Sequence, residues 1–195
     1  LAGPTVVVSA HGIAPDVMRL LADRGFTIID TTCPNVSRAQ CIAANMAHEG
    51  LTVVIFGDAA HSEVRGLLGW AGNGALATMD ASDVASTSHA SSGTRLGIIS
   101  QTTQRVQEFS EFVQQVCAGV LEHSREVRVV NTLCDATQRR QAAAADLART
   151  VDVMIVIGGR NSANTLRLAE TCAAITETIH IESVDELDET ALRGK

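Results

Sequence analysis

The sequence predicts an α/β protein built from repeated units with parallel strands. Short runs rich in Val, Ile and Thr alternate with Ala- and Leu-rich stretches of helical length, a pattern typical of parallel sheets covered by helices. One arrangement of strand, cysteine, helix, strand and glycine also occurs twice along the chain. With 195 residues, of which 46% are hydrophobic and 19% charged, the chain can bury the core of one large domain or two small ones.

The expected strands and helices follow one another in regular order. Pro15 and Gly25 mark the start and the end of the first helix, since proline favours the first turn and glycine the position just past the last. Residues 80–93 are rich in Ser, Thr, Ala and Gly and predict a surface loop or a weak helical turn. The expected strands are Thr5–Ser9, Thr27–Asp30, Thr52–Phe56, Leu76–Met79, Arg95–Ser100, Val127–Asn131, Asp152–Ile157 and Thr178–Glu182. The expected helices are Pro15–Arg24, Ser37–Glu49, Glu63–Leu68, Val106–Val120, Ala136–Arg149, Asn164–Ile175 and Asp185–Leu192.

An internal repeat relates two parts of the chain. Ile28–Cys33 matches Val129–Cys134 without a gap, and the match continues into the following helix, where Gln40 corresponds to Gln141. Both cysteines come just after the carboxyl end of a strand. Two core cysteines could fall there by chance, but a repeated functional site explains the placement more simply.

Polar side chains gather in the loops after the expected strands. Ligands of open parallel sheets bind at the carboxyl ends of the strands, and helices that begin there present free N–H groups to anions. Each residue also has an ordinary interpretation, as a helix cap, a first-turn acid or a half-buried thiol. Cys41, Cys117 and Cys172 lie among apolar residues of helical patterns and are expected in the core. The candidate site residues are His11, Cys33, His61, Glu63, Thr102, Thr103, Cys134, Ser162 and Asn164.

Comparison with known catalytic and metal-binding motifs limits the kinds of site that the candidate residues could form. His61-Ser62-Glu63 has the H-x-E form of zinc deaminases, but the P-C-x-x-C partner is absent. The chain has no C-x-x-C, H-E-x-x-H, P-loop or G-x-G-x-x-G motif either, which disfavours the standard zinc and nucleotide sites. Two thiols from separate loops suit an iron–sulfur cluster, and the histidines and hydroxyls suit a phosphate-bearing ligand.

Composition excludes several other classes of protein. With 22 acidic and 15 basic residues, one Trp and no Tyr, the chain lacks the basic stripes and aromatic platforms of nucleic-acid binders. No apolar run approaches the ~20 residues of a membrane helix. The first residues do not resemble a signal peptide, so a cytoplasmic protein with reduced cysteines is expected.

The polar loops resemble those of the 4-hydroxy-3-methylbut-2-enyl diphosphate reductase family, which catalyses the last step of the methylerythritol phosphate route to isoprenoids. The motifs occur in the family's order and cover nearly the whole chain. They are Ser9-Ala10-His11-Gly12, Asp30-Thr31-Thr32-Cys33-Pro34, the segment 57–63 (Gly-Asp-Ala-Ala-His-Ser-Glu), Gln101-Thr102-Thr103, Cys134 with the segment 136–141, and the segment 158–164 leading into 167–170.

The resemblance implies a trefoil of three similar α/β units around a [4Fe-4S] cluster held by one cysteine from each unit. Cys33 and Cys134 match two of these cysteines. It also implies a reductive dehydroxylation, in which two electrons enter through the cluster, water leaves, and an allylic diphosphate becomes isopentenyl or dimethylallyl diphosphate. The electrons come from a donor such as ferredoxin or flavodoxin.

The family's substrate-site residues can be carried over one by one. Glu63 matches the acid that delivers a proton, and Thr102 matches the threonine that hydrogen-bonds the substrate hydroxyl group. The residues that match the diphosphate site are His11, His61, Ser162 and Asn164.

The chain departs from the family pattern near both ends. A Gly-Phe-Cys-x-Gly-Val motif, an early histidine and an Ala-Gly-Ala-Ser segment are absent, and Ala163 stands where serine is common. The expected organisation is a remnant of the first unit (1–33), a second unit (34–130) and an incomplete third unit (131–195). With two matching cysteines, the cluster is predicted to be incomplete and labile, or shared between chains. Two alternatives remain: a non-catalytic diphosphate-binding module, and a zinc protein that uses Cys33, Cys134 and His61.

Overall fold

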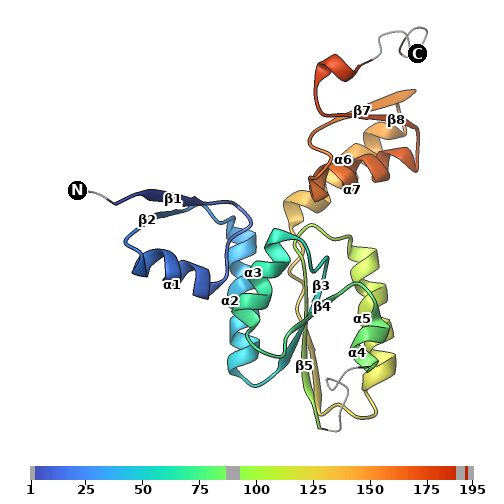
Figure 1. The fold of residues 1–195 in the computed structure, drawn as a ribbon. Helices are drawn as coiled ribbons and strands as arrows, with labels where there is room; N and C mark the ends of the chain where they lie inside the picture. The colour runs from blue at the N-terminus through green and yellow to red at the C-terminus, as the bar shows by residue number, and fades with distance from the viewer. Residues whose placement is uncertain (1–2, 87–92, 188–191, 193–195) are drawn as a thin grey trace. The chain divides into compact units, whose positions relative to one another are not determined.

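Strands and helices alternate along the chain in the computed structural model, which describes residues 3–86, 93–187 and 192 (Figure 1). Every strand pair in these residues is parallel, so the predicted α/β class is confirmed. The chain divides into two compact units, residues 1–133 and 134–195, and each is described by itself. The finer division into 1–33, 34–130 and 131–195 stays a prediction.

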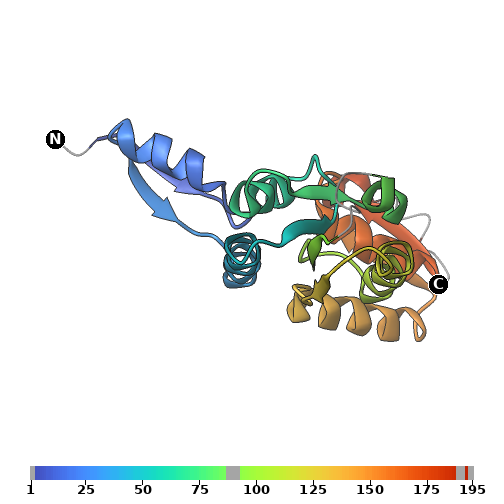
Figure 2. The ribbon, with the colours of Figure 1, turned by 90° about the horizontal axis from the view of Figure 1, so that it is seen from below.

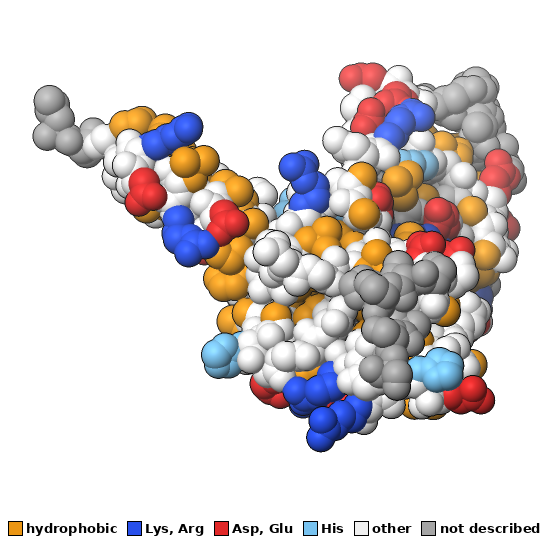
Figure 3. Space-filling model, turned by 60° about the horizontal axis from the view of Figure 1, so that its bottom comes forward, with side chains coloured by type: hydrophobic (Ala, Val, Ile, Leu, Met, Phe, Trp, Pro, Cys, Tyr) orange, Lys and Arg blue, Asp and Glu red, His pale blue; other side chains and the backbone are white. Residues whose placement is uncertain are grey.

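The first unit begins with a two-stranded sheet and one helix. β1 (Thr5–Val8) pairs with β2 (Thr27–Asp30), and α1 (Pro15–Asp23) joins them along one face (Figure 2). Val7 lies opposite Ile29 in the register, and both side chains are exposed, at 62% and 49%. Figure 3 shows hydrophobic side chains among charged ones on the surface of this part of the unit. Because two strands and a helix bury little apolar area, we expect this part to open more easily than the larger sheet.

A four-stranded sheet forms the centre of the first unit, in the order β4-β3-β5-β6. Its helices cover both faces (Figure 1), and side chains alternate between them: Val53 and Ile55 of β3 face one layer, and Val54 and Phe56 face the other. The strands are β3 (Thr52–Phe56), β4 (Leu76–Thr78), β5 (Arg95–Ser100) and β6 (Glu126–Val129). The helices are α2 (Pro34–His48) and α3 (Ser62–Ala71) on one face, and α4 (Ala81–Ser86) and α5 (Val106–Val120) on the other.

Replacing Leu96 by alanine tests the core between this sheet and α5. Leu96 is fully buried there with Phe112 and Val116, so Leu96→Ala is expected to lower the free energy of unfolding by about 2–5 kcal/mol. The matched change Leu121→Ala, at a residue 60% exposed, is expected to cost less than about 0.5 kcal/mol. Urea unfolding measures both, and equal losses in the two variants would contradict this assignment of the core.

The second unit repeats the same plan on a smaller scale. β7 (Val153–Ile157) pairs with β8 (Glu177–Ile181). The helices α6 (Asp135–Ala148) and α7 (Ala163–Ala173) pack against each other and against this pair, around Ala148, Val156 and Cys172. A short 3₁₀ helix, η2 (Val184–Glu186), follows β8.

Several boundaries differ from those expected. α2 begins at Pro34, three residues before the predicted Ser37, because proline's fixed φ suits the first helical position. Within residues 80–93, where a loop or weak turn was expected, residues 81–86 form α4; residues 87–92 lie outside the described part. The helix expected over 185–192 is represented by η2, and residues 188–191 lie outside the described part. No helix among the described residues has both the length and the apolar character needed to cross a membrane.

The expectation that three cysteines lie in the core is correct for Cys172, which is buried, and wrong for Cys41, which is exposed. Cys117 is half-buried. The buried face of α2 is formed by Val36, Ala39, Gln40, Ala43 and Met46. Each residue of a helix turns by about 100°, so Cys41 points away from that face.

Candidate functional site

His61 is the residue from which α3 starts. It is the N-cap of that helix, and its Nδ1 accepts a hydrogen bond of 3.1 Å from the backbone N–H of Glu63. A neutral imidazole that accepts at Nδ1 carries its proton at Nε2. The half-buried His61 ring therefore has a donor left for a ligand.

The Glu63 side chain is buried beneath this helix start and bound by Thr102. It is 1% exposed. The backbone N–H of Thr102 donates to Oε1 at 2.7 Å, and the Thr102 hydroxyl donates to Oε2 at 2.9 Å. Thr102 is itself buried, in the loop that follows β5. Two side chains predicted to act on the same substrate therefore touch, although Glu63 belongs to the first turn of α3 and Thr102 to the loop after β5.

Burial raises the pKa of the Glu63 carboxyl above its ordinary value. The loss of solvation is the largest cause, and the two hydrogen bonds from Thr102 and the nearby His61 and His11 act in the opposite direction. A carboxyl with a raised pKa holds its proton at higher pH than an exposed one. Glu63 is thus suited to act as a proton donor.

His11 lies beside His61, with the two ring centroids 5.3 Å apart and the rings at 88°. Its side chain is exposed and is carried by a tight turn in which the Gly12 N–H donates to the Ser9 carbonyl at 3.0 Å. Gly12 has a φ of +68°, a left-handed conformation that glycine adopts without a Cβ penalty. Two imidazoles side by side at one edge of the unit form a pair of potential donors to an anion.

Gln101 is a residue of this site that the sequence did not single out. It is 1% exposed, and its Oε1 accepts from the Asp58 N–H at 3.3 Å and from the Gln104 side chain at 3.1 Å. A Cβ on Gly57 would approach the Gln101 Cβ to 2.8 Å, so glycine is needed for this close contact. Gln101 joins the loop before His61 to the loop that holds Thr102. Its place inside the Gln-Thr-Thr motif was the one available signal.

Cys33 and Cys134 occupy equivalent positions, as the repeat predicted. Each is half-buried, outside any disulfide, and the N-cap of a helix, α2 or α6. The turn before each is also the same: Asp30 Oδ1 accepts from the Thr32 N–H, and Asn131 Oδ1 accepts from the Leu133 N–H, both at 2.9 Å. Both sulfur atoms therefore lie at a helix N-terminus, where backbone N–H groups favour a negatively charged ligand.

Ser162 and Asn164 belong to the second unit and lie at the start of α7. Ser162 is its N-cap, and its Oγ accepts from the Thr165 N–H at 3.4 Å. Asn164 is exposed in the first turn of the helix. Both therefore stand beside free backbone N–H groups, the usual setting for a bound phosphate.

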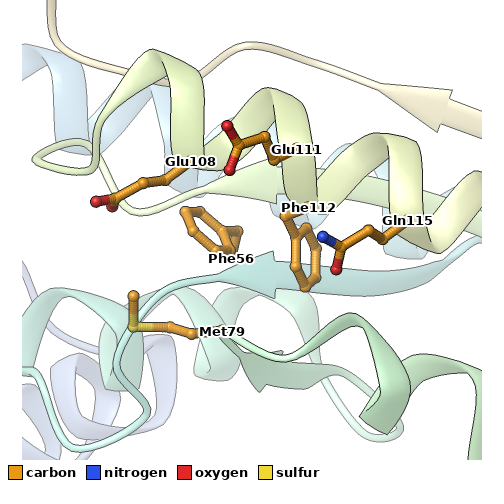
Figure 4. A pocket seen from close by; sticks show the side chains of 6 residues that line it. All are labelled: Phe56, Met79, Glu108, Glu111, Phe112 and Gln115. Carbon is orange, nitrogen blue, oxygen red and sulfur yellow. The ribbon is translucent and has the colours of Figure 1, made fainter.

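The structure brings together His11, His61, Glu63 and Thr102 within the first unit. Within the described residues, no three His, Cys, Asp or Glu side chains gather in a way that could hold a metal ion. A separate open hollow of about 200 Å³ lies between β3 and α5, lined by Phe56, Met79, Glu108, Glu111, Phe112 and Gln115 (Figure 4). It shares no residue with the predicted site.

The chain matches one family of known proteins along nearly its whole length. The family model described as LytB protein matches residues 2–195. This chain belongs to the LytB family. The family's 4-hydroxy-3-methylbut-2-enyl diphosphate reductase from Dehalococcoides mccartyi is 43% identical to this LytB chain over 194 residues, which are 100% of the chain and 68% of that protein. The enzyme of the same name from Geobacter sulfurreducens is 39% identical, over 97% of the chain and 65% of that protein.

Two solved structures resemble this LytB chain. The structure titled as (E)-4-hydroxy-3-methyl-but-2-enyl diphosphate reductase, the terminal enzyme of the non-mevalonate pathway, is 37% identical with a TM-score of 0.65, over 97% of the chain and 66% of that structure. The Plasmodium falciparum enzyme is 24% identical with a TM-score of 0.86, over 99% of the chain and 60% of that structure, and shows the fold alone.

These comparisons confirm the predicted resemblance to the reductase family and the predicted fold of repeated parallel α/β units in a three-unit plan. They favour the reductase over a separate diphosphate-binding module or a zinc protein. The LytB chain spans about two thirds of the length of its relatives.

Proposed function

We propose that this chain carries the substrate-binding and proton-delivering machinery of a 4-hydroxy-3-methylbut-2-enyl diphosphate reductase. The observation that carries the proposal is the buried Glu63 carboxyl, bound twice by Thr102 and placed next to the His11–His61 pair. An acid with a raised pKa beside two imidazole donors suits a substrate with a hydroxyl group to be lost and a charged tail to be held.

The diphosphate is assigned to His11, His61, Ser162 and Asn164. The Nε2–H of His61 is left for a ligand because the Nδ1 of the same ring accepts from the backbone N–H of Glu63. Ser162 and Asn164 add side-chain donors and the free N–H groups at the start of α7, where the helix dipole favours an anion. Binding energy from the charged tail then holds the hydroxyl end in place for the reaction.

The proton travels through Thr102 and Glu63. The Thr102 hydroxyl oxygen lies 2.9 Å from Glu63 Oε2. When Glu63 is protonated, it donates to the Thr102 oxygen, and the Thr102 O–H donates to the oxygen of the substrate hydroxyl group. The overall reaction takes two electrons and two protons, breaks the allylic C–O bond, forms a C–H bond and releases water. Glu63 in its protonated form supplies a proton to the departing hydroxyl through Thr102, and burial keeps bulk water from competing.

The donor chemistry of Cys33 and Cys134 fits an iron–sulfur cluster, because both thiols lie at helix N-termini and outside disulfides. We assign them as two of the cysteines that hold a [4Fe-4S] cluster. When bound, the cluster supplies the two electrons and a Lewis-acidic iron for the hydroxyl oxygen. A ferredoxin or flavodoxin is the proposed electron donor, and the cytoplasm the proposed compartment.

The test of the proposed function is turnover by the 195-residue chain itself. The chain is reconstituted without oxygen with iron and sulfide, reduced with dithionite, and given 4-hydroxy-3-methylbut-2-enyl diphosphate. Formation of isopentenyl and dimethylallyl diphosphate is the expected result. Binding of the substrate with no product from a chain that holds a cluster would support the alternative of a binding module.

The cysteine assignment predicts the iron content of single variants. Cys33→Ser and Cys134→Ser are each expected to lose more than about half of the iron and sulfide that the wild-type chain takes up, because each removes a thiolate ligand. Cys41→Ser, at an exposed cysteine of the same helix as Cys33, is the matched control and is expected to keep the wild-type amount. Loss of iron in Cys41→Ser with none in Cys33→Ser would reverse the assignment.

A further inference from the structure

Gln40 is a buried polar residue that the proposed chemistry does not use. It lies on the inner face of α2 and is 6% exposed. Its Nε2 is buried and has no hydrogen-bond partner in the described part of the chain. Buried donors in folded proteins are rarely left unpaired, and each such group calls for an explanation.

The Gln40 amide lies directly against the turn that carries His11. A Cβ on Gly12 would come within 2.3 Å of Gln40 Nε2, so the amide occupies the space where a side chain at position 12 would lie. Gly66 of α3 faces the same place: its Cβ position is 3.7 Å from Gln40 Nε2 and 3.8 Å from the Gly12 carbonyl oxygen. Glycine at position 12 therefore leaves room for the amide between the turn and α3.

The internal repeat supplies a second, independent observation. Gln141 stands seven residues after Cys134, as Gln40 stands seven after Cys33. Its Nε2 is likewise buried without a partner among the described residues. The same unpaired amide group therefore occurs at the same place in both repeats, which an accident of side-chain packing in one unit does not explain.

We propose that Gln40 is a positioning residue for His11. When an anion binds at His11 and the turn moves toward Gln40, the Gln40 side-chain N–H donates a hydrogen bond to the Gly12 carbonyl and holds the turn in that position. The inference rests on the proposed diphosphate site. The Gln40 Nε2 and the Gly12 carbonyl oxygen lie within 3.8 Å of the same point, the Cβ position of Gly66, so the donor and the acceptor are neighbours. Since the free form leaves a donor unpaired, the bond favours the form that holds the anion.

The test measures inorganic pyrophosphate binding to the 195-residue chain by calorimetry. Gln40→Met keeps the length and most of the volume of the side chain but has no donor, and it is expected to bind pyrophosphate about 5- to 10-fold more weakly than wild type. Gln40→His, which restores an N–H donor, is expected to recover part of the loss. Gln114→Met, at an exposed glutamine of α5, is the matched control and should bind like wild type.

A second measurement separates positioning from a structural role. In the wild-type chain, the side-chain N–H₂ signals of Gln40 in a ¹⁵N NMR spectrum are expected to move when pyrophosphate is added. The ring nitrogen signals of His11 are expected to move as well. Unchanged Gln40 signals while His11 responds, or equal pyrophosphate affinity in wild type and Gln40→Met, would overturn the inference. Wild-type chain that does not bind pyrophosphate at all would instead overturn the proposed diphosphate site.

Discussion

Glu63→Gln is expected to lower product formation by the reconstituted chain by about 10²- to 10⁴-fold, the usual loss when a general acid is removed. Glutamine keeps the shape of the side chain and still accepts the Thr102 N–H bond that Oε1 accepts now, but it has no acidic proton to deliver. Substrate affinity should stay within a few-fold of wild type, because the diphosphate is assigned to other residues. A product assay and a binding titration measure the two effects separately.

The control for this loss is Glu122→Gln, at an exposed glutamate of the same unit, which is expected to leave turnover unchanged. If Glu63→Gln keeps more than about a tenth of the wild-type rate, the loss is smaller than the removal of a general acid usually causes. In that case the proton has another source, and the role given to Glu63 is wrong.

The same variant has a pH dependence of stability with a defined sign. Burial raises the pKa of Glu63 in the folded chain above its usual value of 4.5. Its contribution to stability is therefore complete below about pH 4.5 and is lost as the pH rises through the folded pKa. As the pH rises from about 4.5 to the pKa of Glu63 in the folded chain, Glu63→Gln should become more stable relative to wild type. It should keep this advantage at higher pH. Urea unfolding from about pH 4 to about pH 8 checks the sign, and a gain that grows as the pH falls would contradict it.

Thr132→Val is expected to lower the free energy of unfolding of the first unit by about 2–4 kcal/mol. The Thr132 side chain is fully buried. Its hydroxyl oxygen accepts from the Ser100 N–H at 2.8 Å, and its O–H donates to the Ser100 carbonyl. The side chain thus pairs with the end of β5 beyond the last residue of β6. Valine fills the same space and leaves both Ser100 groups buried without partners.

Two further variants make this result specific. Thr132→Ser keeps the hydroxyl group and is expected to lose about 1 kcal/mol or less, the value of one buried methyl group. Thr5→Val, at an exposed threonine of β1, should change stability by less than about 0.5 kcal/mol. Urea unfolding at neutral pH measures all three, and equal stability of Thr132→Val and Thr132→Ser would show that the hydrogen bonds contribute little.

The sequence was sufficient to predict most of the fold and to place the candidate residues at the ends of strands. Periodicity is local, so the strands of the central sheet were predicted to within a few residues. The repeat placed Cys33 and Cys134 just after two equivalent strands, and in the structure α2 and α6 begin directly after them. The prediction was wrong for Cys41, because apolar neighbours on a helix do not tell which face of it turns inward.

By itself, the sequence determined the α/β class, the family and the set of residues at the strand ends, because these follow from local patterns and from motifs in order. Only the tertiary structure decided that Glu63 is buried against Thr102, that Gln101 joins two loops, and that the Gln40 amide lies unpaired beneath Gly12. Burial, hydrogen-bond partners and the pKa of a carboxyl depend on residues far apart in the chain. No local pattern contains those contacts, so they exist only once the sheet has brought its loops together.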